Sequence, residues 1–319
     1  MEFVMGGAAA SGAALFTNPL EVVKTRIQLQ GELQARGRYP VHYKNVAHAL
    51  FTIVRHDGFR AVQSGLGPAL CYQFCQNGFR LGVFHVLEDL QLTKNDNGEV
   101  SLSRSVLAGA VAGSGGAFVA SPLYMIKTQL QSKSQNTVIA VGFQHRHGGM
   151  LAALSAVWAA GGLKGLWRGA SAATIRVSMG SSVQLGTFSK AKSVIVKHFP
   201  TMRDRTMLCT FFSSVLSGTA VCIVMTPFDV VCTRLYNQGL DPHTSKGLYY
   251  NGFLDCFSKI LHSEGPLGFY KGISAAFLRC GPHTVISLTL WQILRDLDLA
   301  SRTSRPPVVS LSPSAKLSG

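Results

Sequence analysis

The sequence predicts an all-α membrane protein in which six transmembrane helices form three pseudosymmetric repeats, with short helices between them. One observation behind this is a proline-initiated segment that recurs at Pro19, Pro122 and Pro227, at intervals of 103 and 105 residues. Self-similarity at a fixed period indicates one structural unit used repeatedly. A second observation is a pair of glycines seven residues apart that recurs in the same register: Gly58/Gly65, Gly162/Gly169 and Gly265/Gly272.

Composition is the third observation, and it favours a membrane. Of the 319 residues, 47% are hydrophobic and only 14% are charged, which is too apolar for an ordinary soluble enzyme of this length. The formal charge of +15 is nevertheless strongly basic. Lysines and arginines are scattered between apolar segments and form no patch interleaved with aromatic residues, so we expect no nucleic-acid partner. Basic loops and an interior that attracts anions account for both properties.

The seven cysteines predict neither disulfides nor a metal site, because none of them lies at metal-ligand spacing. Cys71 and Cys75 share a helical face but have no histidine nearby. We therefore expect small buried thiols in a reducing compartment, no metal and no other cofactor. No cleavable targeting segment is visible, because apolar sequence starts at Phe3 without a preceding basic region.

Each repeat is predicted to contain a long helix, a hydrophilic loop with a short amphipathic helix, and a second long helix. Six apolar stretches reach the roughly 20 residues that span a bilayer. They lie near residues 3–29, 66–90, 106–130, 170–196, 208–236 and 273–297, with short helices near 43–56, 147–160 and 250–263. We place the repeats at residues 1–98, 99–200 and 201–300, followed by a Ser/Pro-rich tail, 301–319, that we expect to be disordered.

Features inside the long helices predict how they pack. The three prolines lie late in the first helix of each repeat and should kink it. Small residues four positions apart, a spacing that permits close helix contact, precede each proline at Gly6/Ala10, Gly109/Gly113 and Ser214/Gly218. The long helices also contain more glycine, serine and polar residues than lipid-exposed helices tolerate. One face of each should therefore meet protein or water.

The proline segments carry an acidic and a basic position three residues apart. The three copies are Pro19-x-Glu21-x-x-Lys24, Pro122-x-Tyr124-x-x-Lys127 and Pro227-x-Asp229-x-x-Cys232. They resemble the P-x-[DE]-x-x-[KR] signature of the mitochondrial carrier family (solute carrier family 25), over about residues 1–300. The resemblance implies a monomeric six-helix barrel in the mitochondrial inner membrane that opens alternately to the matrix and the cytoplasm.

The acidic and basic positions lie on one helix face, so around a threefold axis each acid can reach the base of the next repeat. This predicts a matrix gate with two ion pairs, Glu21–Lys127 and Asp229–Lys24. The third pair, Tyr124–Cys232, cannot be ionic, so we expect a weaker gate supported by a hydrogen bond from Gln129 beneath Lys127. The alternative is that Glu21 and Lys24 only satisfy each other within one helix.

The family's cytoplasmic motif, [FY]-[DE]-x-x-[KR], is eroded in this chain. It occurs as Phe84-His85-x-x-Glu88, Phe188-Ser189-x-x-Lys192 and Trp291-Gln292-x-x-Arg295. Every acid is replaced, and Glu88 stands where a base is expected. Ser189–Arg295 and Gln292–Glu88 could still form hydrogen bonds between helices, but we expect no strong ionic cytoplasmic gate.

Glycine turns with aromatic neighbours resemble the cardiolipin sites of the family, in which helix N-termini receive lipid phosphates. The residues concerned are Trp167, Gly169, Tyr270, Gly272 and Gly252. The first repeat departs from this pattern with Gln63-Ser64-Gly65. The alternative is that these are ordinary aromatic-belt and turn residues.

The repeat register predicts a substrate site on the second helix of each repeat. Positions seven, eleven and fifteen after each closing glycine form one polar stripe per helix: Tyr72, Gln76, Arg80; Arg176, Gly180, Gln184; Arg279, His283, Ser287. Arg176 and Arg279 have no carboxylate within a turn of their own helices, so we expect two unpaired guanidiniums suited to a dianion. Snorkelling or pairing with a distant acid is the alternative. His283 is expected to be a satisfied polar residue rather than a proton switch.

In the carrier family these positions correspond to substrate contacts, and Arg176-Val177 is typical of keto-acid and carboxylate carriers. The stretch Phe79-Arg80-Leu81-Gly82-Val83-Phe84 and the first proline signature are similar to the oxaloacetate-carrier-like branch, which includes the animal members 34 and 35 of the family. The implied function is exchange or uniport of small dicarboxylate anions. A carrier-fold scaffold, or a regulated proton or anion leak, is the alternative. We expect no enzyme, because no nucleophile–base pair stands in a convincing context.

Overall fold

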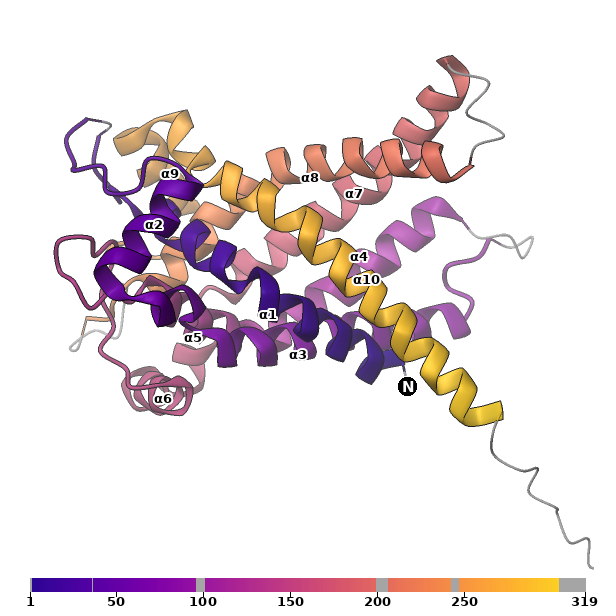
Figure 1. Cartoon of the computed structure of the whole chain (residues 1–319), viewed down its shortest axis with the longest axis horizontal. Helices are drawn as coiled ribbons and strands as arrows, with labels where there is room; N and C mark the ends of the chain where they lie inside the picture. The colour runs from indigo at the N-terminus through magenta and orange to yellow at the C-terminus, as the bar shows by residue number, and fades with distance from the viewer. Residues whose placement is uncertain (1, 36, 96–100, 199–205, 242–246, 304–319) are drawn as a thin grey trace, which may run out of the picture.

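The computed structural model describes residues 2–35, 37–95, 101–198, 206–241 and 247–303. Its helices follow one another in three similar sets (Figure 1). The first set is α1 (Glu2–Leu29), α2 (Val46–Asp57), η1 (Phe59–Gln63) and α3 (Leu66–Asp89). The second set is α4 (Leu102–Val119), α5 (Ser121–Ser132), α6 (Met150–Leu166) and α7 (Ala170–His198). The third set is α8 (Thr206–Asn237), α9 (Phe253–Glu264), η3 (Pro266–Tyr270) and α10 (Ile273–Thr303).

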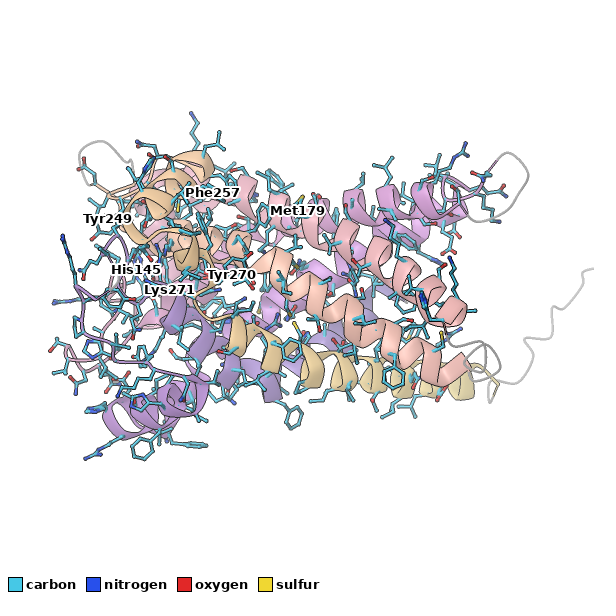
Figure 2. All side chains as sticks on the ribbon, turned by 90° about the horizontal axis from the view of Figure 1, so that it is seen from above. His145, Met179, Tyr249, Phe257, Tyr270 and Lys271 are labelled. Atoms are coloured by element: carbon cyan, nitrogen blue, oxygen red, sulfur yellow. The ribbon has the colours of Figure 1, made fainter. Side chains whose placement is uncertain are left out.

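The long helices run side by side along the molecule, and α2, α6 and α9 cover one end (Figure 1). Around the ring, α1 packs on α3 and α10, α4 packs on α3 and α7, and α7 packs on α8. His145, Tyr249, Tyr270 and Lys271 lie at the end covered by the short helices, whereas Met179 lies along the long helices (Figure 2). The N-terminus and the last turns of α10 lie at the opposite end.

The predicted all-α class with three repeats is confirmed, but hydropathy detects the membrane spans poorly. Among the described residues, the single helix long and apolar enough to cross a membrane by composition is Phe212–Asn237, with a mean hydropathy of 1.8. Two bent pairs of helices meet the same criterion when each pair is counted as one span. These pairs are Ser103–Val119 with Ser121–Ser132, and Met150–Leu166 with Ala170–His198. The other long helices fall below this level because each places polar side chains on the face that points into the molecule.

The prolines act differently in the three repeats. Pro122 lies in the first turn of α5, and α4 and α5 meet there at an angle of 62°. Pro19 and Pro227 lie inside α1 and α8, which continue past them. The expected tail also begins later than predicted, because α10 continues to Thr303; residues 304–319 lie outside the described part of the chain.

Small residues bring helices together in the first two repeats. A Cβ on Gly6 would lie 2.1 Å from the side chain of Leu81 on α3, and one on Gly113 would lie 2.9 Å from Val177 on α7. The expectation fails in the third repeat, where a Cβ on Gly218 would meet no atom within 4 Å. Therefore α8 does not pack closely on α10 at this level.

Buried ion pairs attach two of the short helices to the long helices. Arg26 on α1 binds Asp57 at the end of α2, with Nη1 2.6 Å from Oδ2. Arg234 on α8 binds Glu264 at the end of α9, which also binds Lys271 at 2.7 Å. Burial by itself would raise the pKa of Glu264, but hydrogen bonds and charge from Arg234 and Lys271 hold it below its usual value.

Candidate functional site

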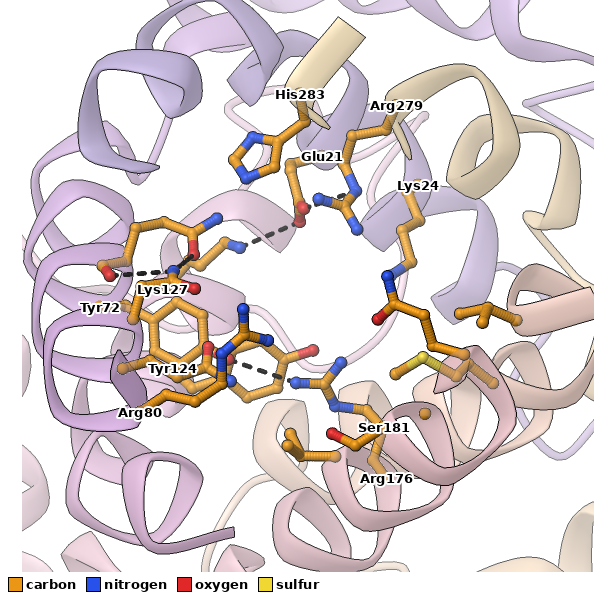
Figure 3. A pocket seen from close by; sticks show the side chains of 18 residues that line it. Glu21, Lys24, Tyr72, Arg80, Tyr124, Lys127, Arg176, Ser181, Arg279 and His283 are labelled. Carbon is orange, nitrogen blue, oxygen red and sulfur yellow. Dashed lines mark hydrogen bonds and ion pairs between the residues drawn. The ribbon is translucent and has the colours of Figure 1, made fainter. Parts of the chain in front are cut away.

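A cavity of about 190 Å³ lies between the long helices, and its lining comes from α1, α3, α5, α7, α8 and α10 (Figure 3). Val177 and eight of the nine predicted stripe residues line it, whereas Ser287 does not; the eight are Tyr72, Gln76, Arg80, Arg176, Gly180, Gln184, Arg279 and His283. Glu21, Lys24, Tyr124 and Lys127 of the proline signatures also line it. The repeat register therefore predicted correctly that residues up to 211 positions apart in the sequence, from Tyr72 to His283, line one cavity.

The two ion pairs predicted between repeats are present. Lys24 Nζ lies 2.7 Å from Asp229 Oδ2, and Lys127 Nζ lies 3.0 Å from Glu21 Oε2. The lysines and Asp229 are buried, with side-chain exposures of 8% or less. Each pair joins the first helices of two repeats, so the alternative in which Glu21 pairs with Lys24 on its own helix is wrong. Glu21, Lys24 and Lys127 of these pairs themselves line the cavity.

The expectation of two unpaired arginines is wrong. Arg176 Nη1 lies 3.2 Å from Asp229 Oδ1, and it also donates through Nη2 to the Tyr72 hydroxyl at 3.3 Å. Arg279 Nε lies 2.9 Å from Glu21 Oε1, so the two side chains form an ion pair. The N–H of Nε does not point at the carboxylate well enough to form a hydrogen bond. Both acids come from a neighbouring repeat, so the sequence around each arginine does not reveal its partner. Each carboxylate is thus shared between one lysine and one arginine.

Two tyrosines occupy the position where the third acid–arginine pair would be. By the repeat register, Tyr124 corresponds to Glu21 and Asp229, and Tyr72 corresponds to Arg279 and Arg176. The ring centroids of Tyr72 and Tyr124 are 4.9 Å apart. Lys127 Nζ lies 5.3 Å from the Tyr72 centroid and 5.5 Å from that of Tyr124, and Arg176 lies 5.3 Å from the Tyr124 centroid. Aromatic contact and cation–π attraction therefore join the helices where an ion pair is missing.

One expectation for the third link is wrong, and the link itself is not ionic, as predicted. Gln129 does not support Lys127, because its Nε2 donates to the backbone carbonyl of Tyr236 at 3.2 Å. Cys232 is fully buried in an apolar cluster with Tyr124 and Tyr236, whose rings are 5.1 Å apart. The third link is thus apolar and aromatic, without the supporting hydrogen bond that was expected from Gln129.

Positive charge exceeds negative charge in the cavity. The cationic residues that line it are Lys24, Lys127, Arg176, Arg279 and Arg80. The first four pair with Glu21 or Asp229, whereas Arg80 has no ion pair among the described residues and is exposed to the cavity (Figure 3). Five cations against two carboxylates leave three positive charges uncompensated.

His283 is held as a polar residue. The Thr17 hydroxyl donates to the carbonyl of Ala13 at 3.0 Å, so it accepts from Nδ1 of His283 at 3.2 Å. This contact agrees with the expectation of a satisfied polar side chain.

The predicted cytoplasmic ring is open in this structure. Glu88, Lys192, Gln292 and Arg295 are exposed. Glu88 pairs with His85 of its own helix at 3.8 Å, and Arg295 lies over the Trp291 ring of its own helix at 5.4 Å. The hydrogen bond expected between Gln292 and Glu88 is therefore replaced by contacts within single helices. The side chain of Ser189, predicted to bind Arg295, lies outside the described part of the structure.

The glycine and aromatic residues predicted to bind cardiolipin do not all lie at one site. Gly169 and Gly252 line one cavity of about 400 Å³ together with Arg168, at the starts of α7 and α9. Tyr270 lines a different cavity of about 390 Å³ between the first and third repeats, while Gly272 precedes α10 with φ of 80°. Trp167 lies beside Phe118 and donates through Nε1 to its carbonyl at 2.9 Å. Only Gly169 and Gly252 of the predicted lipid residues are thus brought to one cavity.

The family model described as mitochondrial carrier protein matches residues 1–95, 98–199 and 203–298. The chain belongs to the mitochondrial carrier family. This mitochondrial carrier is therefore a transporter and a multi-pass protein of the mitochondrial inner membrane.

Relatives of this carrier are similar over nearly their whole length. It is 50% identical over 297 residues to solute carrier family 25 member 35 of Mus musculus, which covers 92% of this chain and 97% of the relative. It is 41% identical over 290 residues to mitochondrial citrate transporter E of Aspergillus niger, covering 90% of each. It is also 41% identical over 292 residues to the mitochondrial oxaloacetate transport protein of Schizosaccharomyces pombe. That alignment covers 90% of this chain and 87% of the relative.

Sequence reasoning missed several residues of the carrier's site. Gln73, Asn77, Ser181, Val221 and Met225 also line the cavity. Gln73 and Asn77 are each next to a stripe residue on α3, and the Asn77 amide donates to Gln73 Oε1 at 3.0 Å. A predicted stripe that also included the residue after each stripe position would have contained Gln73, Asn77 and Ser181. Val221 and Met225 lie on α8, where no polar pattern marks the cavity-facing side.

Proposed function

We propose that this carrier transports small carboxylate dianions of the oxaloacetate type, by exchange or uniport. The observation that carries this proposal is the excess of three positive charges in the cavity. Buried cations are costly unless an anion reaches them. The cavity volume of about 190 Å³ is below the roughly 300–1,000 Å³ of pockets that hold drug-sized ligands. A small acid suits it better than a nucleotide does.

The shared carboxylates suggest how substrate binding is coupled to opening of the matrix gate. A substrate carboxylate that binds Arg279 takes the place of Glu21, and one that binds Arg176 takes the place of Asp229. The two lysines and the two arginines each keep an anionic partner in this exchange, so it avoids the penalty of breaking a buried pair. It also loosens contacts of α1 with α10 and of α7 with α8. Substrate then favours rearrangement to the extent that its affinity differs between the two states.

The relatives support carboxylates as the substrate class. Two relatives, each 41% identical over 90% of this chain, are a citrate transporter and an oxaloacetate transport protein. Both substrates carry at least two carboxylates, which suits two arginines on opposite sides of one cavity (Figure 3).

Uptake of radiolabelled acids by liposomes containing the purified full-length protein tests the proposal. We expect exchange of oxaloacetate or another four-carbon dicarboxylate against an internal dicarboxylate, and none of a nucleotide. Anion and proton leak measured in the same liposomes tests the alternative. No uptake of any carboxylate, together with a steady proton leak, would refute carboxylate transport.

We also propose that the cavity containing Arg168, Gly169 and Gly252 binds a cardiolipin phosphate. The backbone N–H groups at the starts of α7 and α9, with the guanidinium of Arg168, supply donors for an anionic head group. Native mass spectrometry should show retained cardiolipin that is reduced in Arg168→Gln. Equal retention in both proteins would refute this lipid site.

A further inference from the structure

Two cysteines from different helices face each other in the third repeat. The Sγ atoms of Cys222 on α8 and Cys280 on α10 lie 3.6 Å apart, and both thiols are free. A disulfide bond is roughly 2.05 Å long, so the sulfurs must approach each other by about 1.5 Å to form one. Neither thiol takes part in the gate or in the arginine contacts described above.

The pair lies directly behind the cavity wall. Val221 and Arg279, the sequence neighbours of the two cysteines, line the cavity. Cys222 is 6% exposed, whereas Cys280 is partly exposed. Of the two thiols, Cys280 is therefore the one that a small oxidant reaches first. The thiolate is the reactive form of cysteine, and the guanidinium of Arg279 supplies a positive charge one residue away.

The helices that carry the pair are loosely packed on each other. α8 packs mainly on α7, and α10 packs mainly on α1, while direct packing between α8 and α10 is sparse. A Cβ added to Gly218 on α8 or to Gly281 on α10 would meet no atom within 4 Å. Relative movement of these two helices thus breaks few contacts. A covalent bond between them would therefore restrict a movement that packing permits.

We propose that Cys222 and Cys280 form a reversible disulfide that ties α8 to α10 when a hydroperoxide reaches the pair. In the first step a thiolate sulfur attacks the O–O bond of hydrogen peroxide, which with a proton gives a sulfenic acid and water. In the second step the other thiol sulfur attacks the sulfenic sulfur and releases a second water as the S–S bond forms. Two thiols are oxidised by two electrons and one peroxide is reduced to two waters. Exchange with a low-molecular-weight thiol reverses the bond.

The effect on transport rests on the proposed function. Alternating access requires the helices around the cavity to rearrange, so a tie across α8 and α10 slows the cycle. The thiol pair itself does not depend on what the carrier transports, so its chemistry and its effect on transport can be measured separately.

Peptide mapping tests the disulfide in the full-length protein in liposomes. The protein is treated with hydrogen peroxide, free thiols are blocked with N-ethylmaleimide, and the digest is analysed by mass spectrometry with and without dithiothreitol. We expect one linked peptide pair that contains Cys222 and Cys280, lost in Cys222→Ser and in Cys280→Ser. Cys71→Ser, which changes a partly exposed thiol on α3, is the matched control and should keep the link.

Dicarboxylate uptake measured on the same samples tests the effect. We expect peroxide to lower the initial rate severalfold, dithiothreitol to restore it, and Cys222→Ser to be insensitive. Maleimide labelling of both thiols after peroxide would overturn the disulfide, whatever the transport result. A linked protein that transports at the unmodified rate would overturn the regulatory effect. If the serine variants do not fold, mapping of the unsubstituted protein still decides the first question.

Discussion

Arg80 provides the sharpest test of the cavity, because it separates substrate binding from structural support. The other four cationic residues of the cavity each pair with Glu21 or Asp229, whereas Arg80 has no acid partner in the described structure and is exposed. A hydrogen bond to a charged group contributes about 1.5–3 kcal/mol. Since about 1.4 kcal/mol corresponds to a factor of ten, Arg80→Gln should raise the half-saturation concentration for a dicarboxylate about 10- to 100-fold.

Thermal stability of the substrate-free protein should change little in Arg80→Gln. The substitution removes one of three uncompensated positive charges, so repulsion falls and the melting temperature stays equal or rises. Arg279→Gln is the matched comparison. Because it leaves Glu21 with Lys127 alone, it should weaken uptake and also lower the melting temperature; a buried pair that loses a partner costs about 3–5 kcal/mol, and less where another partner remains.

Initial uptake rates over a range of substrate concentrations, with fluorescence-detected melting of the same preparations, measure both quantities. Arg80→Lys should fall between the unsubstituted protein and Arg80→Gln, because it keeps the charge and loses the bidentate geometry. Unchanged half-saturation in Arg80→Gln would refute the argument that the uncompensated charge binds substrate.

Three further predictions concern the proposed gate and the loop that contains His145. Lys24→Gln, which leaves Asp229 with Arg176 alone, should lower the melting temperature and raise efflux of trapped substrate in the absence of external substrate. Tyr124→Leu should raise the same efflux because it removes ring contacts, each of which contributes about 0.5–2 kcal/mol, whereas Tyr124→Phe should behave as the parent. Burial lowers the pKa of His145 to about 4, so its stabilising contribution is full above about pH 6.5 and is lost as the pH falls toward 4.

Each of these predictions has a control. For Lys24→Gln it is Asp229→Asn, which breaks the same pair from the other side and should give the same direction of change. Equal efflux from Tyr124→Leu and Tyr124→Phe would show that the aromatic link does not close the gate. Melting curves between pH 7 and pH 5 should shift less in His145→Asn, where Asn can still donate to the Asn237 carbonyl. A shift as large in this variant would assign the pH dependence to other groups.

Much of the site could be predicted because the repeats share a register. That register placed Tyr72, Arg176 and Arg279 at one level, and it paired Glu21 with Lys127 across repeats. It could not show that Arg279 also reaches Glu21, since spacing along one helix carries no information about the acid on its neighbour. The packing of the third repeat was missed for a similar reason, because close packing depends on the helix opposite Gly218.

The sequence alone determined the architecture and the identity of the chemical groups. Repetition of one proline signature specifies three related units, and the periodicity of a helix specifies which side chains share a face. Only the tertiary structure decided how those groups share their charges. Two carboxylates each serve a lysine and an arginine, a tyrosine pair replaces the third such contact, and two cysteines meet across a loose seam. The physical reason is that these contacts join different helices, so their partners depend on helix positions that no local pattern specifies.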